Sequence, residues 1–349
     1  MQKINLAVIF GGKSGEHEIS LSSARGVISS LNKEKYNIQH LAITKKGQWL
    51  AGQEAEQYLE LTEKFKINSE EVEKLISESK KDGLEILIKK EIDGEKIDVI
   101  LPILHGPFGE DGKLQGMLEI INLPYIFSKP LAHAIAMNKP KAKIIAEHVG
   151  VLTANSFSFN KKDELDVNEI IDELDFPIVV KPAELGSSVG MTLAKNEKDL
   201  KAGIKKAFAV DENIILERFI SGREMTVPVA DIKKPEAVAV MEIIAQKVEW
   251  YDYNSKYEEG GSRHVCPAEI PEEVEQKLKE QAVRIFQEIG CRDLARADFI
   301  WDDENDQIYF LEINTIPGMT PTSLAPETIQ KNGMELGDFL DKLIEKRLG

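Results

Sequence analysis

The chain begins with an apolar strand, a glycine turn and a helix, and this order limits the fold more than any other feature. Residues 4–10 form a short apolar run that stops at Gly11 and Gly12. Apolar residues then recur at helical spacing between residues 16 and 31. A strand, a turn and a helix in this order start a βαβ unit. We therefore predict an alternating α/β domain in the first third of the chain.

The rest of the chain shows further strand and helix patterns. Residues 53–96 are rich in Glu and Lys, and we interpret them as solvated helices or an insertion with no assigned function. Strands are predicted at 97–104, 176–180, near 192, 214–217, 225–230, 237–244, 294–300 and 308–313, and helices at 113–121, 130–148, 271–289 and 335–346. With boundaries near 125 and 220, the predicted domains are 1–125, 126–220 and 221–349.

Size, charge and cysteine content limit the possible partners. The 349 residues allow two or three domains. With 60 acidic and 44 basic residues the net charge is -16, which argues against nucleic-acid binding through a broad basic surface but leaves ATP binding open. Cys266 and Cys291 form neither a disulfide framework nor a CxxC site. No apolar run has the length of a membrane helix, and no cleavable signal pattern precedes the first strand. We expect a cytoplasmic protein without a membrane partner.

The segment 295–322 carries the densest set of candidate ligands. Residues two apart in a strand share a face, so Arg296 lies on the same face as Asp298, and Glu312 on the same face as Asn314. If these strands pair, one wall presents carboxylate and amide oxygens beside an arginine. Such hard donors suit Mg²⁺ or Mn²⁺. Two amphipathic strands with a solvated polar face would give the same spacing.

A second candidate is a phosphate-binding site. Lys181 ends an apolar strand five residues before the small-residue loop 186–190, and a lysine with backbone amides can hold a phosphate. The loop has no Walker A spacing. The first glycine turn lacks GxGxxG, so we reject an oxidoreductase with a bound dinucleotide. A surface lysine beside a plain linker remains the alternative.

Several single residues are candidates for substrate contacts. The Gly318 N–H can donate to an oxyanion, and the N–H groups near Ser323 and Leu324 open a helix-like stretch that could hold a carboxylate. Glu18, in the first turn of the first helix, could bind an ammonium group. His105 follows a strand end, where α/β sheets place ligands. Taken singly, each residue fits an ordinary turn, cap or structural role equally well.

One long connection has the composition of a lid. Residues 251–261 combine three tyrosines with charged residues and two glycines. Tyrosines are costly to leave exposed, so we predict an ordered lid loop over 251–265. An ordinary surface loop is the alternative.

Together these segments closely resemble the D-alanine–D-alanine ligases of the ATP-grasp superfamily. The resemblance follows the expected order over nearly the whole chain and is weakest over residues 53–96, where we expect a subfamily-specific insertion. The strings that carry it are GGKSGEHEISL (11–21), LHGPFGEDGKLQGMLE (104–119), VVKPAELGSSVGM (179–191), ILERFISGREMTV (215–227), YDYNSKY (251–257), ARADF (295–299) and EINTIPGMTPTS (312–323).

The resemblance implies a three-domain fold and a ligase reaction. A Rossmann-like N-terminal α/β domain would precede two ATP-grasp subdomains that hold ATP between their sheets. The enzyme would join two D-alanines through an acyl phosphate, release ADP, use two Mg²⁺ or Mn²⁺ ions, act in peptidoglycan precursor synthesis and form a homodimer. Excluding water from an acyl phosphate gives the lid a purpose.

The resemblance also implies roles for matching residues. The nucleotide contacts would be Lys139 and Lys181 at phosphate, Glu217 at the adenine amino group, Arg218, Phe219 and Ile220 as the hinge, Glu224 at the ribose, and Lys256 from the lid. The metal ligands would be Asp298, Glu312 and Asn314. The substrate contacts would be Arg296 and the Gly318 N–H at the oxyanion, Glu18 and His105 near the first D-alanine, and Ser323 and Leu324 at the second. Tyr257 would join Ser187 and Glu18 in a hydrogen-bonded triad.

Two positions bear on variation within the family. Asn138 stands where the family pattern has an aspartate, which changes a local charge. Tyr257 favours an amine acceptor over D-lactate. The other hypotheses are a different ATP-grasp ligase that makes an ester or another D-amino-acid pair, a nucleotide-binding regulatory protein, and an interaction module.

Overall fold

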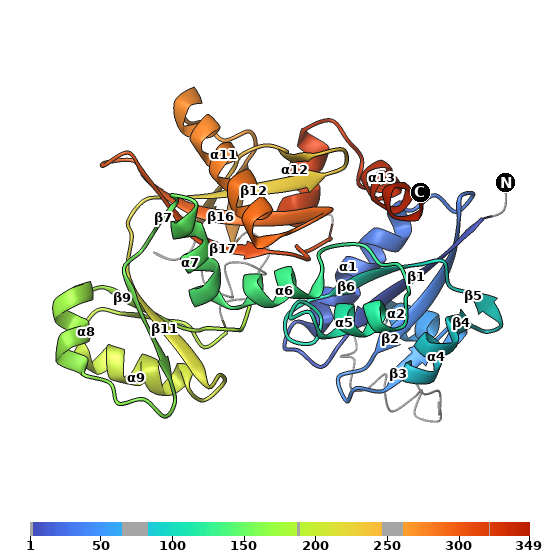
Figure 1. Cartoon of the computed structure of the whole chain (residues 1–349), viewed down its shortest axis with the longest axis horizontal. Coiled ribbons are helices and arrows are strands. Elements are labelled where there is room, and N and C mark those ends of the chain that lie inside the picture. Colours follow the sequence, from blue (N-terminus) through green and yellow to red (C-terminus); the bar gives the residue numbers. More distant parts are fainter. Residues whose placement is uncertain (1–2, 65–82, 187–188, 246–260, 321) are drawn as a thin grey trace.

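Three larger β-sheets lie in three parts of the molecule (Figure 1), and the described residues also form one two-stranded sheet. The structure, a computed structural model, describes residues 3–64, 83–186, 189–245, 261–320 and 322–349. In the N-terminal sheet, β1 (Ile4–Gly11) pairs in parallel with β2 (Tyr36–Ile43) and β6 (Val99–Leu104), and β3 (Trp49–Ala51) is antiparallel to β2. The first helix, α1 (His17–Ser30), follows the glycine turn. The predicted α/β start is therefore confirmed.

The segment predicted as an insertion is partly packed into this N-terminal part. It contains α2 (Gln53–Lys64), α4 (Gly83–Lys89) and the short strands β4 (Glu91–Ile92) and β5 (Glu95–Lys96). Tyr58 of α2 is fully buried, and its hydroxyl hydrogen-bonds Nε2 of His17 at 2.9 Å. The interpretation as solvated helices is thus wrong for α2, because one apolar face covers the sheet.

The central sheet is antiparallel and has a core of its own. Its order is β10 (Thr192–Ala194), β9 (Ile178–Pro182), β11 (Asn213–Arg218) and β8 (Ser156–Asn160). The helices α8 (Val167–Leu174) and α9 (Glu197–Ala207) pack their apolar residues against this sheet. The connection between β9 and β10 contains the small-residue loop.

The C-terminal sheet is built around β12 (Arg223–Asp231), β16 (Leu294–Asp302) and β17 (Gln307–Asn314), which run antiparallel. Its remaining strands are β13 (Pro235–Ala237), β14 (Met241–Ala245), β15 (Ser262–Val265) and β7 (Leu152–Thr153), and α11 (Glu272–Ile289) packs on it. The strand predicted at 237–244 is therefore two strands, β13 and β14.

The helix predicted at 130–148 is also divided in two. α6 (Pro130–Met137) ends before Asn138, and α7 (Lys139–His148) begins after it. Pro140 has no N–H to donate, so it fits the first turn of a new helix better than the interior of a long one. The Asn138 side chain caps α7 by accepting from the Lys141 N–H at 3.1 Å. Both helices pack with Phe299 in the core of the C-terminal sheet.

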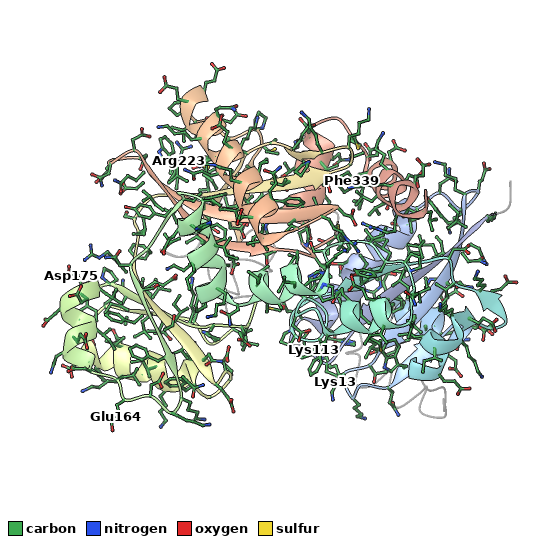
Figure 2. The ribbon with its side chains drawn as sticks, in the orientation of Figure 1. Lys13, Lys113, Glu164, Asp175, Arg223 and Phe339 are labelled. Atoms are coloured by element: carbon green, nitrogen blue, oxygen red, sulfur yellow. The ribbon has the colours of Figure 1, made fainter. Side chains whose placement is uncertain are left out.

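The chain returns to the N-terminal part at its end. α12 (Leu324–Lys331) and α13 (Leu336–Leu348) share one hydrophobic core with β1. Phe339 of α13, labelled in Figure 2, is 1% exposed in that core. The N-terminal and C-terminal parts are thus joined by buried apolar contacts, whereas the central sheet has a separate core. Within the described ranges, no helix is both long and apolar enough to cross a membrane.

Candidate active site

The central and C-terminal sheets enclose a cavity of about 360 Å³ between them. Its walls come from β9, β11, β12, β14, β16 and β17, together with the N-terminus of α7. Nine residues predicted to bind nucleotide or metal line it: Lys139, Lys181, Glu217, Arg218, Phe219, Ile220, Glu224, Asp298 and Glu312. Residues that lie up to 173 positions apart in the sequence therefore line one space.

A buried carboxylate between two lysines forms one end of this cavity. Glu217 Oε1 accepts from Lys143 Nζ at 2.6 Å, and Glu217 Oε2 pairs with Lys181 Nζ. Burial alone would raise the pKa of Glu217, but Lys181 and Lys143 outweigh it and lower that pKa to about 2. Glu217 is therefore an ionised acceptor at the cavity wall. Lys143 also donates to the Ala154 carbonyl at 2.7 Å.

A third lysine reaches the cavity from the start of α7. Lys139 is 7% exposed, and its Nζ donates to the Leu185 carbonyl at 2.6 Å. The same nitrogen lies 3.6 Å from Glu312 Oε2 on β17. This ammonium group thus connects the loop after β9 with the C-terminal sheet, where an anionic ligand could bridge the two sheets.

The candidate metal ligands lie on two adjacent strands, β16 and β17, so the pairing that the sequence left open is present. Asp298 is directly opposite Glu312, and Arg296 is opposite Asn314. Both Asp298 oxygens accept hydrogen bonds from Arg296, at 2.9 and 2.8 Å, and Asn314 Nδ2 donates to Asp298 Oδ2 at 3.1 Å. The set offers two carboxylates and one amide oxygen without thiolate or imidazole, which fits Mg²⁺ or Mn²⁺.

The turn after β17 is held by the N-terminal part. The Ile316 N–H donates to Glu110 Oε1 at 3.2 Å, and His105 Nδ1 donates to the Ile316 carbonyl at 3.2 Å. His105 Nε2 then accepts from Ser23 at 3.1 Å, and Ser23 Oγ accepts from the Met319 N–H at 3.2 Å. Burial lowers the pKa of His105 to about 4, so its ring is neutral. Both nitrogens of His105 are used in positioning this turn.

Two acidic side chains, those of Glu110 and Glu16, lie beside Gly106 on the N-terminal side of this turn. The Glu110 carboxylate accepts from the Gly106 N–H at 2.8 Å as well as from Ile316. Burial first, and the nearby Glu16 carboxylate second, raise the pKa of Glu110 to about 8. A Cβ atom on Gly106 would lie 2.6 Å from Glu16 Oε2, and one on Gly186 would lie 3.0 Å from it. Glu16 therefore lies between this loop and the loop that follows β9.

The structure places Glu18 elsewhere. Its side chain is 51% exposed and pairs with Lys45 at 3.1 Å on the surface of the N-terminal part. The helix α1 begins at His17, so Glu18 lies within its first turn. Glu16 precedes the helix, and its carboxylate lies beside Gly106 and Gly186 in the two loops. The structure thus brings Glu16, and not Glu18, to the two loops, and the ammonium contact expected at Glu18 stays a prediction.

The residues predicted at the second carboxylate site lie at the start of α12. Ser323 is the residue before the helix, Leu324 begins it, and Ser323 Oγ accepts from the Thr320 N–H at 3.1 Å. A Cβ atom on Gly318 would lie 2.8 Å from Ser323 Oγ, so the Gly318 backbone and this helix end are adjacent. Ser187, Lys256, Tyr257 and most of the predicted lid lie outside the described residues.

Comparison with known proteins gives the same answer along the whole chain. The descriptions "D-ala D-ala ligase N-terminus" and "D-ala D-ala ligase C-terminus" match residues 5–128 and 145–345. The D-alanine–D-alanine ligase of Thermoanaerobacter sp. (strain X514) is 38% identical over 99% of this chain and 96% of that protein, and that of Chloroherpeton thalassium is 39% identical over 100% and 97%. The chain belongs to the D-alanine–D-alanine ligase family.

Solved structures of this family have the same fold. The VanG D-Ala:D-Ser ligase from Enterococcus faecalis has a TM-score of 0.81 at 31% identity and covers 99% of both chains. The D-alanyl-alanine synthetase A from Vibrio cholerae has a TM-score of 0.83 at 27% identity and covers 100% of this chain and 99% of that one. The predicted ATP-grasp fold is thereby confirmed for this member of the D-alanine–D-alanine ligase family.

Sequence reasoning missed three residues of this ligase site. Lys143 lies one helical turn after Lys139, so i,i+4 spacing on the same helix could have indicated it. Glu110 lies in the loop 105–112, which is longer than a simple connection requires. Glu16 lies two residues from the predicted Glu18, and only the exact start of α1 separates the two.

Proposed function

We propose that this chain joins two molecules of D-alanine to D-alanyl-D-alanine with the conversion of ATP to ADP and phosphate. One observation carries the proposal. The ammonium group of Lys139 lies 3.6 Å from the carboxylate of Glu312, a candidate metal ligand on β17. A transferring phosphoryl group needs such cations and oxygen ligands on either side of it. Family membership supports the same reaction.

We propose one orientation for ATP in this cavity. Glu217 would accept from the adenine amino group at the hinge formed by Arg218, Phe219 and Ile220. A carboxylate has about four acceptor positions, so Glu217 can take this bond while it stays paired with its two lysines. Glu224 would accept from the ribose, and the phosphates would extend towards Lys139 and Lys181.

Asp298, Glu312 and Asn314 would hold two Mg²⁺ or Mn²⁺ ions at the phosphate end. Bound there, the metals supply charge neutralisation to the phosphoryl group. The Arg296 guanidinium now pairs with Asp298, and it would be released to the substrate side when Asp298 becomes a ligand. Arg296 is 13% exposed in its side chain, which keeps it within the site and not in bulk water.

The first D-alanine would bind on the N-terminal side of the turn after β17. Glu16 would hold its ammonium group, and Arg296 with the Gly318 N–H would stabilise the negative oxygen that forms during the reaction. The carboxylate of this D-alanine attacks the γ-phosphorus of ATP, which gives an acyl phosphate and releases ADP. The second D-alanine would place its carboxylate at the α12 N-terminus, beside Ser323 and Leu324, where backbone N–H groups favour an anion. Its amine then attacks the acyl carbon, and phosphate leaves.

The acceptor is the point at which related activities diverge, because one similar structure is described as a D-Ala:D-Ser ligase. Purified protein would be incubated with ATP, Mg²⁺ and D-alanine, alone or with an equal amount of D-serine or D-lactate. We expect D-alanyl-D-alanine as the main product by mass spectrometry in each mixture, and none from L-alanine. Exclusive formation of D-alanyl-D-serine or of the ester would replace the proposed acceptor.

We also propose that the protein works as a cytoplasmic homodimer in peptidoglycan precursor synthesis. ATP and free D-alanine as substrates favour that compartment. Light scattering on the purified protein tests the assembly, with a mass near 78 kDa expected from two chains of 39.1 kDa. A mass of one chain at micromolar concentration would remove the dimer from the proposal.

A further inference from the structure

We infer that Arg292, Asp293 and Arg347 form a clamp that sets the position of the N-terminal part relative to β16, the strand that carries the candidate metal ligand Asp298. The clamp would affect the binding of D-alanine, because it aligns Glu16 and Glu110 of the N-terminal part with Arg296 of β16. Only the expected change in the KM for D-alanine rests on the proposed function. None of the three clamp residues lines the nucleotide cavity.

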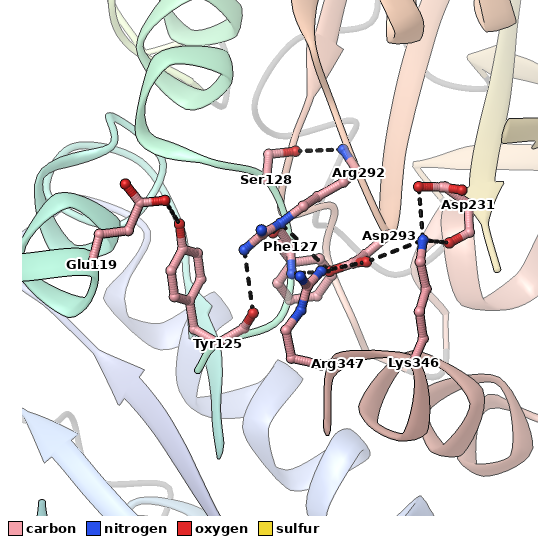
Figure 3. Close-up of polar contacts among 9 residues, drawn as sticks. All are labelled: Glu119, Tyr125, Phe127, Ser128, Asp231, Arg292, Asp293, Lys346 and Arg347. Carbon is pink, nitrogen blue, oxygen red and sulfur yellow. Dashed lines mark hydrogen bonds and ion pairs between the residues drawn. The ribbon is translucent and has the colours of Figure 1, made fainter. Parts of the chain in front are cut away.

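The centre of the clamp is the carboxylate of Asp293, directly before β16 (Figure 3). This side chain is completely buried. Asp293 Oδ2 accepts from the Phe127 N–H at 2.9 Å, and one Arg347 nitrogen donates to both oxygens at 2.9 and 2.8 Å. One carboxylate therefore joins the start of β16 to the segment before α6 and to the end of α13.

The preceding residue, Arg292, also hydrogen-bonds the segment before α6. Arg292 Nε donates to the Phe127 carbonyl at 2.5 Å, and the Arg292 N–H donates to Ser128 Oγ at 3.2 Å. The guanidinium also lies 4.8 Å from the centre of the Tyr125 ring, a cation–π distance. Residues 125–128 are the link through which the chain leaves the N-terminal sheet, so Arg292 and Asp293 fix the link itself.

The third element is α13, which packs on the N-terminal part. Lys35, just before β2, donates to Asp341 of α13 at 2.6 Å, and α13 shares the core of β1. Lys346, next to Arg347, donates to Asp231 Oδ2 at 2.8 Å, and the Asp231 N–H donates to the Asp293 carbonyl at 2.8 Å. The clamp thus connects the N-terminal part to β16 along two routes, the link and the helix.

The polar contacts of the clamp are better suited to fixing the orientation of the N-terminal part relative to β16 than to holding the two together. The shared apolar core already attaches the two parts, and burying a carboxylate costs free energy that apolar packing would not. Directional hydrogen bonds to a buried charge define one orientation, whereas apolar surfaces can slide. Arg296 lies on β16 three residues after Asp293, which directly precedes that strand. A small rotation at Asp293 would therefore misalign Arg296 with the N-terminal carboxylates.

The test compares the single variant Arg347→Met with the double variant Asp293→Asn/Arg347→Met. The single variant leaves a buried carboxylate without its main partner, so we expect a lower melting temperature and a KM for D-alanine raised about tenfold. The dissociation constant for ATP should change less than twofold. The double variant removes the unpaired charge and should recover the melting temperature, while the KM for D-alanine stays raised.

The matched control is Arg284→Met. Arg284 is exposed on α11 and donates to the Val149 carbonyl at 3.0 Å, a bond within the C-terminal part. We expect unchanged KM values for this variant. Recovery of the D-alanine KM together with the melting temperature in the double variant would overturn the clamp, as would equal losses for ATP and D-alanine.

A readout that needs no catalysis separates the clamp from the proposed function. Hydrogen exchange should accelerate in residues 314–319 of the double variant, where Ile316 and Met319 contact the N-terminal part, and stay unchanged in β9 and β11. Faster exchange at 314–319 in a protein that makes no dipeptide would support the clamp and refute the function. Unchanged exchange in an active ligase would refute the clamp alone.

Discussion

Replacing Glu110 by Gln should flatten the dependence of stability on pH. The folded chain raises the pKa of this carboxyl from 4.5 to about 8, chiefly because it is buried and also because Glu16 is close. The folded state therefore keeps a proton that the unfolded state releases, so the stability due to Glu110 falls as pH rises from about 4.5 to about 8. At roughly 1.4 kcal/mol for each tenfold change in proton affinity, the loss is about 5 kcal/mol at most.

The assay is the melting temperature of both proteins at pH 5.0, 6.0, 7.0 and 8.0 in buffers of equal ionic strength. Glutamine can accept only one of the two N–H bonds that Glu110 accepts, so the variant should be less stable than the parent at pH 5. The difference in melting temperature should then narrow as pH rises, because only the parent loses stability when Glu110 loses its proton. Parallel curves over this range would refute the assignment of a protonated Glu110.

Three other substitutions test the site. Glu16→Gln should raise the KM for D-alanine by about tenfold or more through loss of the ammonium contact, while Glu18→Gln, its matched surface control, should not. Glu312→Gln should lower kcat by roughly 10²–10³-fold without changing the melting curve, since a ligand charge is lost. Lys143→Met should raise the dissociation constant for ATP, measured by calorimetry, because Glu217 loses the partner at 2.6 Å that orients it.

Each of these outcomes has a contrary result. A D-alanine KM that rises for Glu18→Gln and not for Glu16→Gln would restore the original assignment. Near-parental kcat in Glu312→Gln would remove that residue from the metal site. Unchanged ATP binding in Lys143→Met would show that Lys181 alone positions Glu217.

The sequence predicted the parts of the site that depend on local periodicity. Alternation in strands was enough to put Arg296 on one face with Asp298 and Glu312 on one face with Asn314, because the strand period fixes which side chains share a face. The pairing that sets Asp298 opposite Glu312 came from the structure. The glycine turn after β1 and the lysine at the end of β9 were equally local signals. Motif resemblance then supplied roles that spacing alone left open.

The rest depends on helix starts and long-range packing. Because α1 starts at His17, Glu16 precedes the helix and lies beside the two loops, whereas Glu18 lies within the helix, and helix ends are the least certain feature of a pattern. Burial of a charge is equally invisible in the sequence. Asp293 reads as an ordinary polar residue before a strand, yet it is fully buried because Arg347, 54 residues later, is brought beside it.

In the proposed reaction, ATP phosphorylates the carboxylate of the first D-alanine before the peptide bond forms. D-alanine labelled with ¹⁸O in both carboxylate oxygens would be incubated with the enzyme, Mg²⁺ and ATP, and the products analysed by mass spectrometry. We expect one ADP and one dipeptide per turnover, one ¹⁸O in each released phosphate and one in the new peptide carbonyl. Unlabelled phosphate, or AMP in place of ADP, would contradict the proposed reaction.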